Sequence, residues 1–143
     1  LKKIQEALLH CHFDSPITFS LYSSLVEDNN KSFSRYNFFL VNYLLFNNKD
    51  SEAEKLIKNS REKHSSNLLI KDTENILLNN KSEKIKNFFN CKNTHDNIAE
   101  IFYVVANLYA TEKNFQLSNF YLKISQLLNK KFTPNTALLK EAP

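Results

Sequence analysis

The sequence predicts an all-α fold built from repeated antiparallel helix pairs, and three observations support this prediction. Apolar residues recur at helical spacing on two consecutive segments between Ala99 and Leu128. An Asn-Asn-Lys motif follows several apolar runs, and two of its copies begin at Asn47 and Asn79, about one helix pair apart. The 143 residues include no glycine. This absence argues against strand hairpins and against glycine-rich phosphate loops, both of which need glycine's backbone freedom.

The clearest helix pair is expected within residues 99–128. Apolar residues form one stripe on each helix: Phe102, Val105, Ala106 and Tyr109 on the first, and Leu117, Tyr121, Ile124 and Leu128 on the second. Neither helix can bury its stripe alone, so the two should pack together. An ordinary helical hairpin without repetition would show the same pattern. Only further copies in the chain distinguish the two interpretations.

Counting Ala99 as the first position of a 34-residue unit, large residues fall at the fourth, eleventh and seventeenth positions, which are Phe102, Tyr109 and Phe115. The small residues of the second helix are Ser118 and Ser125. This pattern resembles the tetratricopeptide repeat (TPR), although glycine and proline are missing from their usual places. The resemblance implies a right-handed α-solenoid of antiparallel helix pairs, with about three repeats plus flanking helices. It also implies a non-catalytic scaffold that binds a protein or peptide in its concave groove.

The Asn-Asn-Lys motif is expected to end helices at 29–31, 47–49 and 79–81. Asparagine tolerates the left-handed conformation that closes a helix, so it can replace the absent glycine. The distance along the chain from Asn47 to Asn79 is also the distance from Ala53 to Ile85. A further step of nearly the same length leads from Ile85 to Ser118. We therefore expect a single domain over 1–143, divided into an N-terminal helix pair (1–33), repeats at 34–65, 66–97 and 98–133, and the start of a further helix at 134–143.

Individual segments lead to more specific expectations. Asp14-Ser15-Pro16 is typical of a helix start, with a capping side chain followed by proline. The segment Tyr36–Phe46 is apolar almost all round and should be buried between neighbouring helices. Asp72 stands where the repeat expects a buried leucine. The helix there is either rotated, shortened or out of phase by one turn, and these alternatives stay open.

The candidate peptide-binding residues follow from the resemblance, because four positions of each first helix usually face the groove of a TPR domain. The residues assigned to this role are Arg35, Phe38, Asn42, Tyr103 and Asn107. The other groove positions are Leu45, Asn67, Ile70, Glu74, Leu77, Glu100 and Ala110. Asn42 and Asn107 resemble one element of the carboxylate clamp in chaperone-binding TPR domains, but the clamp's lysine is replaced by Phe38 and Tyr103. The alternative is that both asparagines satisfy backbone groups of a neighbouring helix.

The sequence contains no recognisable catalytic, cofactor or metal motif, so we expect no enzyme and no cofactor. His10-Cys11-His12 cannot converge on one ion if it is helical, because residues two apart point to different sides. Cys91 and His95 would face each other on a continuous helix, but residues 92–94 are typical of a break between repeats. Cys11 and Cys91 are far apart in sequence and are not expected to form a disulfide framework.

Charge and composition limit the partners. The net charge of +4 arises largely from scattered lysines, which are typical of solvated helix faces. RNA binding is the alternative function, with Phe38 and Tyr103 stacking on bases. It is disfavoured because no regular polar pair recurs in each repeat.

No segment is long enough to span a membrane, no signal-peptide core is present, and the missing initiator methionine suggests a fragment of a longer chain. The compartment stays open.

Self-association is a second expectation, since the ends of a solenoid expose the faces that further repeats would cover. The apolar residues that predict it are Leu1, Ile4, Leu8, Leu138 and Leu139.

Overall fold

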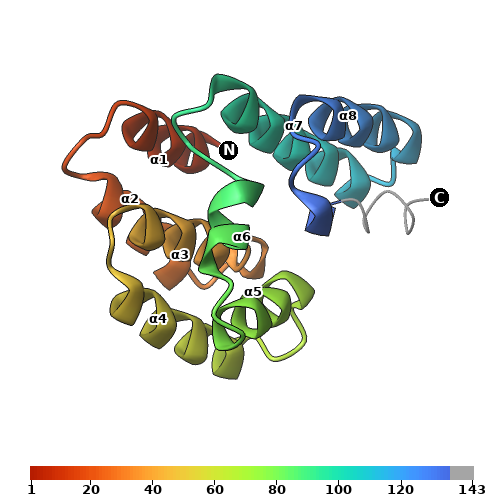
Figure 1. Cartoon of the computed structure of the whole chain (residues 1–143). Helices are drawn as coiled ribbons and strands as arrows, with labels where there is room; N and C mark the ends of the chain where they lie inside the picture. Colours follow the sequence, from red (N-terminus) through yellow and green to blue (C-terminus); the bar gives the residue numbers. More distant parts are fainter. Residues whose placement is uncertain (136–143) are drawn as a thin grey trace.

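The computed structural model describes residues 1–135, and within them every regular element is helical (Figure 1). The elements are α1 (Lys2–His12), α2 (Thr18–Glu27), the 3-10 turn η1 (Lys31–Phe33), α3 (Tyr36–Phe46), α4 (Asp50–Lys63), α5 (Leu68–Leu78), α6 (Ser82–Phe88), α7 (Thr94–Thr111), α8 (Phe115–Leu128) and the 3-10 turn η2 (Thr133–Asn135). The predicted all-α class is confirmed. None of these helices combines the length and the apolar character needed to cross a membrane. The further helix expected at 134–143 falls largely outside the residues that the structure describes.

Within residues 1–135, each of the four helix pairs is joined by a turn containing one non-glycine residue with positive φ. These residues are Asp14, Asn48, Asn80 and Lys113, with φ values of 58°, 59°, 56° and 62°, and they are nearly evenly spaced along the chain. At the second turn the Asn48 amide donates to the Leu45 carbonyl (3.1 Å) and the Lys49 amide to the Leu44 carbonyl (2.9 Å), which is the Schellman arrangement. The same pattern of two hydrogen bonds ends the first helix of each of the other three pairs.

The prediction that an asparagine ends a helix in the left-handed conformation is confirmed at two of the three Asn-Asn-Lys motifs, at Asn48 and Asn80. It is wrong at the first motif. Asn30 has a φ of −73°, and its side chain instead accepts a hydrogen bond from the Ser32 amide (3.0 Å) at the start of η1. The helix start predicted at Asp14-Ser15-Pro16 is confirmed in part. α2 begins at Thr18, shortly after this segment, and the Ser15 hydroxyl accepts a hydrogen bond from the Ile17 amide (3.4 Å). Asp14 itself does not cap the helix, because it takes the left-handed conformation that ends α1.

The main core surrounds α3, which contacts α2, α4, α5 and α6. Phe38 and Phe39 are fully buried. The Phe39 ring lies 4.8 Å from that of Phe89, and the Phe38 ring lies 4.9 Å from that of Phe132, measured between centroids. The prediction that this helix is buried between its neighbours is confirmed.

The orientation of α5 answers the question raised by Asp72. The helix buries Ile70, Thr73 and Leu77, while Asp72 is exposed. Asp72 therefore does not occupy a core position. The following helix, α6, is only seven residues long, and the chain is extended at Phe89, where φ is −156°.

The hairpin formed by α7 and α8 lies beside the body formed by α1 to α6 (Figure 1). Its first helix begins at Thr94, earlier than the predicted repeat boundary at 98. Tyr109 and Tyr121 stack with centroids 5.5 Å apart, and the Ser125 hydroxyl donates to the Ala99 carbonyl (2.6 Å). The hairpin also contacts α1 through α7. The first and fourth helix pairs thus meet, whereas in a linear stack only neighbouring pairs touch.

Two expectations about the N-terminal region are corrected. Cys11 and Cys91 form a disulfide across a sequence separation of 80 residues, because the contact between α1 and α7 brings their Cα atoms within 5.9 Å. Ile4 and Leu8 are buried in the main core, so they do not form an exposed apolar end, although Leu1 is exposed. Leu138 and Leu139, the other residues on which the self-association expectation rested, lie outside the described part of the chain.

Candidate functional site

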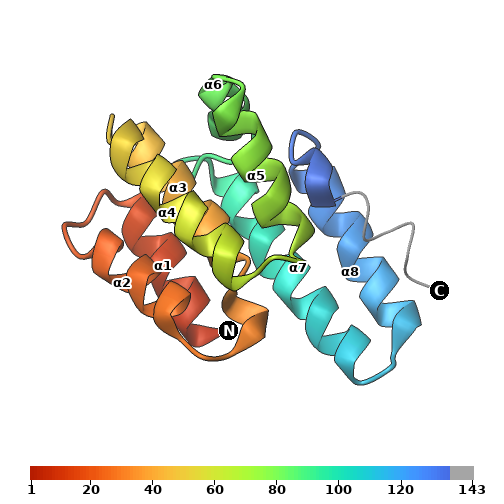
Figure 2. The same ribbon diagram turned by 90° about the horizontal axis from the view of Figure 1, so that it is seen from below.

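A groove of about 1040 Å³ lies between α5 and α7. The two helices that wall it can be followed in Figure 2. It is lined by Lys31, Ser32, Ser34, Arg35, Asn67, Leu68, Leu69, Asp72, Asn75, Ile76, Lys84, Phe88, Tyr103, Asn107, Ala110, Thr111, Thr133 and Pro134. The lining mixes amides and apolar side chains with both signs of charge. We call this feature the α5–α7 groove.

The structure brings three of the five candidate peptide-binding residues to this groove. Arg35, Tyr103 and Asn107 line it. Phe38 and Asn42 do not: Phe38 is fully buried against other aromatic rings, and Asn42 is buried away from the groove. In this conformation neither of those two side chains is open to a ligand in the groove.

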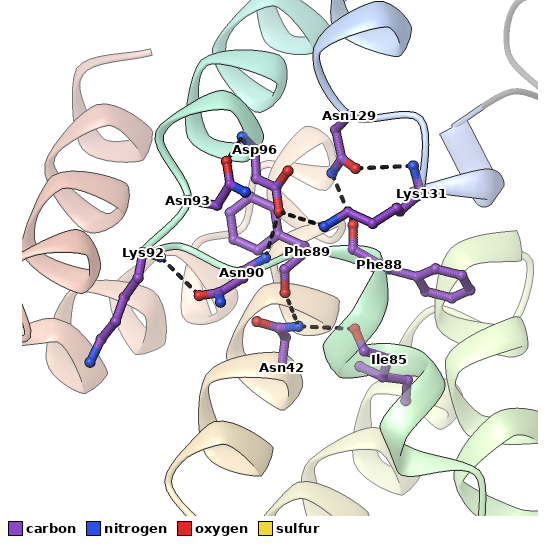
Figure 3. A network of polar contacts seen from close by, with 10 residues as sticks. All are labelled: Asn42, Ile85, Phe88, Phe89, Asn90, Lys92, Asn93, Asp96, Asn129 and Lys131. Carbon is purple, nitrogen blue, oxygen red and sulfur yellow. Dashed lines mark hydrogen bonds and ion pairs between the residues drawn. The ribbon is translucent and has the colours of Figure 1, made fainter.

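Asn42 instead completes the hydrogen bonding of a backbone segment that has left its helix. Its side-chain amide donates to the carbonyls of Ile85 (3.1 Å) and Phe89 (2.8 Å), as Figure 3 shows. The amide of Asn129 donates in the same way to the Phe88 carbonyl (2.9 Å). Carbonyls at a helix end lack intrahelical partners, and leaving them buried and unpaired is costly. These two amides hold the end of α6 between α3 and the end of α8.

Asn107, which was expected to match Asn42 in position, has different surroundings. Its side chain is exposed at the wall of the groove. Within residues 1–135 that amide makes no hydrogen bond to another group. It is therefore available to donate and accept hydrogen bonds with a ligand, which Asn42 is not.

At the groove's inner edge, Arg35 forms a buried bidentate ion pair with Glu100. Its Nε lies 2.9 Å from one carboxylate oxygen and its Nη2 lies 2.6 Å from the other. The Tyr36 hydroxyl donates a third hydrogen bond to this carboxylate, at 2.7 Å. The Glu100 side chain is 1 % exposed and that of Arg35 is 12 % exposed. Because Arg35 precedes α3 and Glu100 lies on α7, the pair joins the main core to the hairpin.

Aromatic rings enclose the Arg35 guanidinium. Its central carbon lies 3.7 Å from the centroid of the Tyr103 ring and 5.2 Å from that of Phe132, within the range of cation–π attraction. Burial alone lowers the pKa of Arg35, but the adjacent Glu100 charge, with further contributions from Tyr103 and Tyr36, raises that pKa overall. Arg35 therefore stays charged, and its Nε and Nη2 are already bound to Glu100.

The phenols near Glu100 stay neutral. Burial, followed by the negative charge of Glu100, raises the pKa of Tyr36 well above its ordinary value. Burial and the same charge also raise the pKa of Tyr22. A neutral Tyr36 can donate its proton to the carboxylate, which is what the observed hydrogen bond requires.

A second polar cluster holds the segment between α6 and α7 (Figure 3). The Asp96 carboxylate accepts a hydrogen bond from the Asn90 amide (3.0 Å) and lies 3.8 Å from the Lys131 ammonium. The side chain of Asn93 caps α7 by accepting from the Asp96 amide (3.2 Å). Burial raises the pKa of Asp96, although the Asn90 hydrogen bond and the Lys131 charge oppose the shift.

The sequence interpretation missed most of the α5 wall, including Leu68, Asn75 and Ile76, together with Lys84 and Phe88 from α6. The sequence did contain one signal for the α5 wall, which is Asp72. A polar residue at an expected core position marks a helix face turned away from the core. Asp72 lines the same groove. The extended segment after α6 had no comparable signal in the sequence.

The described residues contain no group of three or more histidine, cysteine, aspartate or glutamate side chains able to hold a metal ion. Among the same residues, those that line the groove include no histidine or cysteine that could act as a nucleophile or base. The geometry of the groove is suited to contact with a ligand. Comparisons of the chain with family models, curated proteins and solved structures found no match.

Proposed function

We propose that this chain is a non-catalytic scaffold of TPR-like helix pairs, and that it binds a protein or peptide segment in the α5–α7 groove. The observation that carries the proposal is the groove itself. Its lining includes Asn107, whose amide has no partner within residues 1–135, and a strongly exposed apolar side chain, Leu68. Amides hold a peptide backbone without requiring a charge, and exposed leucine gives apolar contact area.

The repeat character is supported by the four left-handed turn residues, Asp14, Asn48, Asn80 and Lys113. Their nearly even spacing is close to the 34-residue unit of the TPR family. The residues at equivalent positions of the second helices, Ala53, Ile85 and Ser118, are all buried. We infer a solenoid wound tightly enough for its first and last pairs to meet, rather than an open superhelix.

The charges of the groove suit binding of a polypeptide. The charged residues that line it are Lys31, Arg35, Asp72 and Lys84. Arg35 is engaged by Glu100, so these residues offer a ligand two lysines and one aspartate. This mixture suits a polypeptide, which carries both signs of charge, better than a polyanion.

A peptide library displayed on phage, selected against the disulfide-bonded protein, tests the proposal. Enriched peptides should bind in calorimetry, and Asn107→Ala should weaken their binding by roughly 1–3 kcal/mol. Leu68→Ala should weaken it as well. Leu127→Ala is the matched control, because Leu127 on α8 is 69 % exposed and Leu68 is 63 % exposed, but only Leu68 lines the groove.

Two outcomes would contradict the proposal. Selected peptides that respond to Leu127→Ala and not to Leu68→Ala would place the binding surface on α8. Failure to enrich any peptide, together with single-stranded RNA binding that weakens steeply with added salt, would favour the RNA-binding alternative.

A further inference from the structure

Beyond the groove, the disulfide lies at the joint between the hairpin and the rest of the molecule. Cys11 is in the last turn of α1, and Cys91 is in the segment that leads from α6 into α7. Around it the contacts are polar: the Cys91 carbonyl is 3.0 Å from His12 Nδ1 and accepts a hydrogen bond from the Asn97 side-chain amide (2.6 Å). The bridge is the only covalent cross-link between α1 and the segment that precedes α7.

A small hollow of about 180 Å³ opens beside this bridge, and both cysteines line it. Lys92 and Asp14 lie at its rim, with their charged groups 3.5 Å apart and largely exposed. Tyr43 and Asn90 form part of its wall. The cysteine side chains themselves are little exposed, so the hollow provides the route by which a small molecule would reach a sulfur atom.

We propose that this hollow is a thiol–disulfide exchange site for small thiols, and that exchange there releases the α7–α8 hairpin from α1. A thiolate R–S⁻ attacks the Sγ of one cysteine, the bond between the two Sγ atoms breaks, and the other cysteine leaves as a thiolate that takes a proton from water. A second thiolate then attacks the mixed disulfide. It yields R–S–S–R and a second protein thiolate. The small thiols supply both electrons, and the lysine at the rim attracts the anionic nucleophile.

The contacts around the bridge determine how its reduction affects the fold. Reduction removes the covalent tie, whereas the ion pair of Arg35 with Glu100 and the Asn129 contact with the Phe88 carbonyl stay in place. The hairpin also keeps its own packing, including the stacked Tyr109 and Tyr121 rings. Without the bridge the hairpin should unfold locally more often, as one unit, while the main core stays intact. Since α7 is one wall of the α5–α7 groove, the groove would widen, and this last consequence rests on the proposed function.

The test treats the native protein with reduced glutathione, without denaturant, and follows intact mass and amide hydrogen exchange. We expect a species carrying one glutathione, then the dithiol form. Amides of residues 94–128 should exchange about tenfold faster or more, while those of α4 (50–63) stay unchanged. This readout contains no ligand, so it can fail or succeed independently of the proposed binding function.

Two sets of variants support the test. Cys11→Ser/Cys91→Ser should show the fast exchange without any thiol, and if it does not fold, reduction of the natural chain still gives the answer. Lys92→Glu should slow the reaction with glutathione by about threefold or more, and Lys55→Glu, the same charge change on the exposed face of α4, should not.

Three results would overturn the proposal. The first is a bridge that is reduced only at denaturant concentrations that also unfold α3 and α4. The second is a reduced protein whose hairpin amides exchange as slowly as in the oxidised protein. The third is an equal reaction rate for the Lys92 and Lys55 variants, which would exclude entry past Lys92.

Discussion

Two regions of this molecule are built from the same kind of helix pair but are held in place by different forces. In α3, nine of the eleven residues are buried. In α7, five of eighteen are buried, and in α8 three of fourteen. The α3 region is therefore stabilised mainly by apolar burial, whereas the α7–α8 hairpin depends on its internal packing and on a limited joint to its neighbours.

The joint combines polar, covalent and apolar contacts. It includes the Arg35 ion pair with Glu100, amide contacts to backbone carbonyls and the Cys11–Cys91 bridge. Its apolar part is Phe132, together with Ile101 and Val104 of α7, which pack against the main core. Damage to the α3 core should destabilise the whole chain. Damage to the joint should release the hairpin first, because its own contacts are retained.

The largest effect is expected in the α3 core. Phe39→Ala removes a fully buried ring in contact with Tyr36, Phe38 and Phe89, and should cost about 3–5 kcal/mol of unfolding free energy. Phe120→Ala is the matched control, since that ring on α8 is 55 % exposed and its loss should cost less than about 1 kcal/mol. Denaturant titration followed by circular dichroism measures both, and equal costs would mean that α3 is not the centre of the core.

The ion pair should give the next largest effect. Glu100→Gln leaves the Arg35 charge buried without its partner and should cost about 3 kcal/mol. Arg35→Met/Glu100→Met removes both charges and should recover much of this loss. Thermal unfolding of the two variants gives the comparison, and a double variant less stable than the single one would contradict the account.

The two asparagines that were expected to face the groove, Asn42 and Asn107, should respond in opposite ways. Asn42→Ala leaves the Ile85 and Phe89 carbonyls without their side-chain donor and should lower stability by roughly 1–3 kcal/mol. Asn107→Ala should leave the melting temperature unchanged and weaken only peptide binding. Loss of stability in the Asn107 variant would mean that this residue also has a structural role.

A small stabilisation is expected at the turn of the hairpin. Lys113 has a φ of 62°, a conformation that costs a residue with a side chain about 1 kcal/mol relative to glycine. Lys113→Gly should therefore raise the unfolding free energy by up to about 1 kcal/mol. Asn48→Gly at the equivalent turn should gain less, because asparagine tolerates this conformation better. An unchanged or lowered melting temperature for Lys113→Gly would argue against the left-handed turn.

The smallest effect concerns pH. Burial raises the pKa of Asp96, so the folded chain binds that proton more tightly than the unfolded chain does. Stability should therefore fall as pH rises from the ordinary carboxyl pKa, about 4, through the raised value, and then stay level. Asp96→Asn removes this dependence while other groups titrate in both proteins. Melting curves across this range should show wild type losing stability relative to the variant, and a relative gain would give the wrong sign.

Local signals in the sequence were sufficient to predict several elements. The apolar character of 36–46 predicted a buried helix, and asparagine after an apolar run predicted the turns at Asn48 and Asn80. The groove positions were less predictable, because the sequence pattern assigned Asn42 and Asn107 the same role. Asn42 is structural because the short α6 ends beside α3, where its side chain donates a hydrogen bond to a backbone carbonyl.

The joint could not be predicted because it depends on contacts between distant segments. Cys11 and Cys91 meet only because α7 packs against α1, and no residue near either cysteine indicates this contact. Glu100 was likewise expected to face the groove, yet it is buried and hydrogen-bonded to Arg35 and Tyr36. Asp72 lies outside the joint. From the sequence its polarity left the rotation, length and phase of this helix open, and the structure shows that it is exposed.

Native-state hydrogen exchange of the oxidised protein, measured residue by residue at increasing denaturant concentrations, tests most directly whether the hairpin is held separately from the α3 core. Amides of α3 should exchange only through global unfolding, with a steep dependence on denaturant. Amides of α7 and α8 should exchange through an opening of lower free energy and weaker denaturant dependence. Identical free energies and slopes for both regions would show a single cooperative unit and would contradict this account.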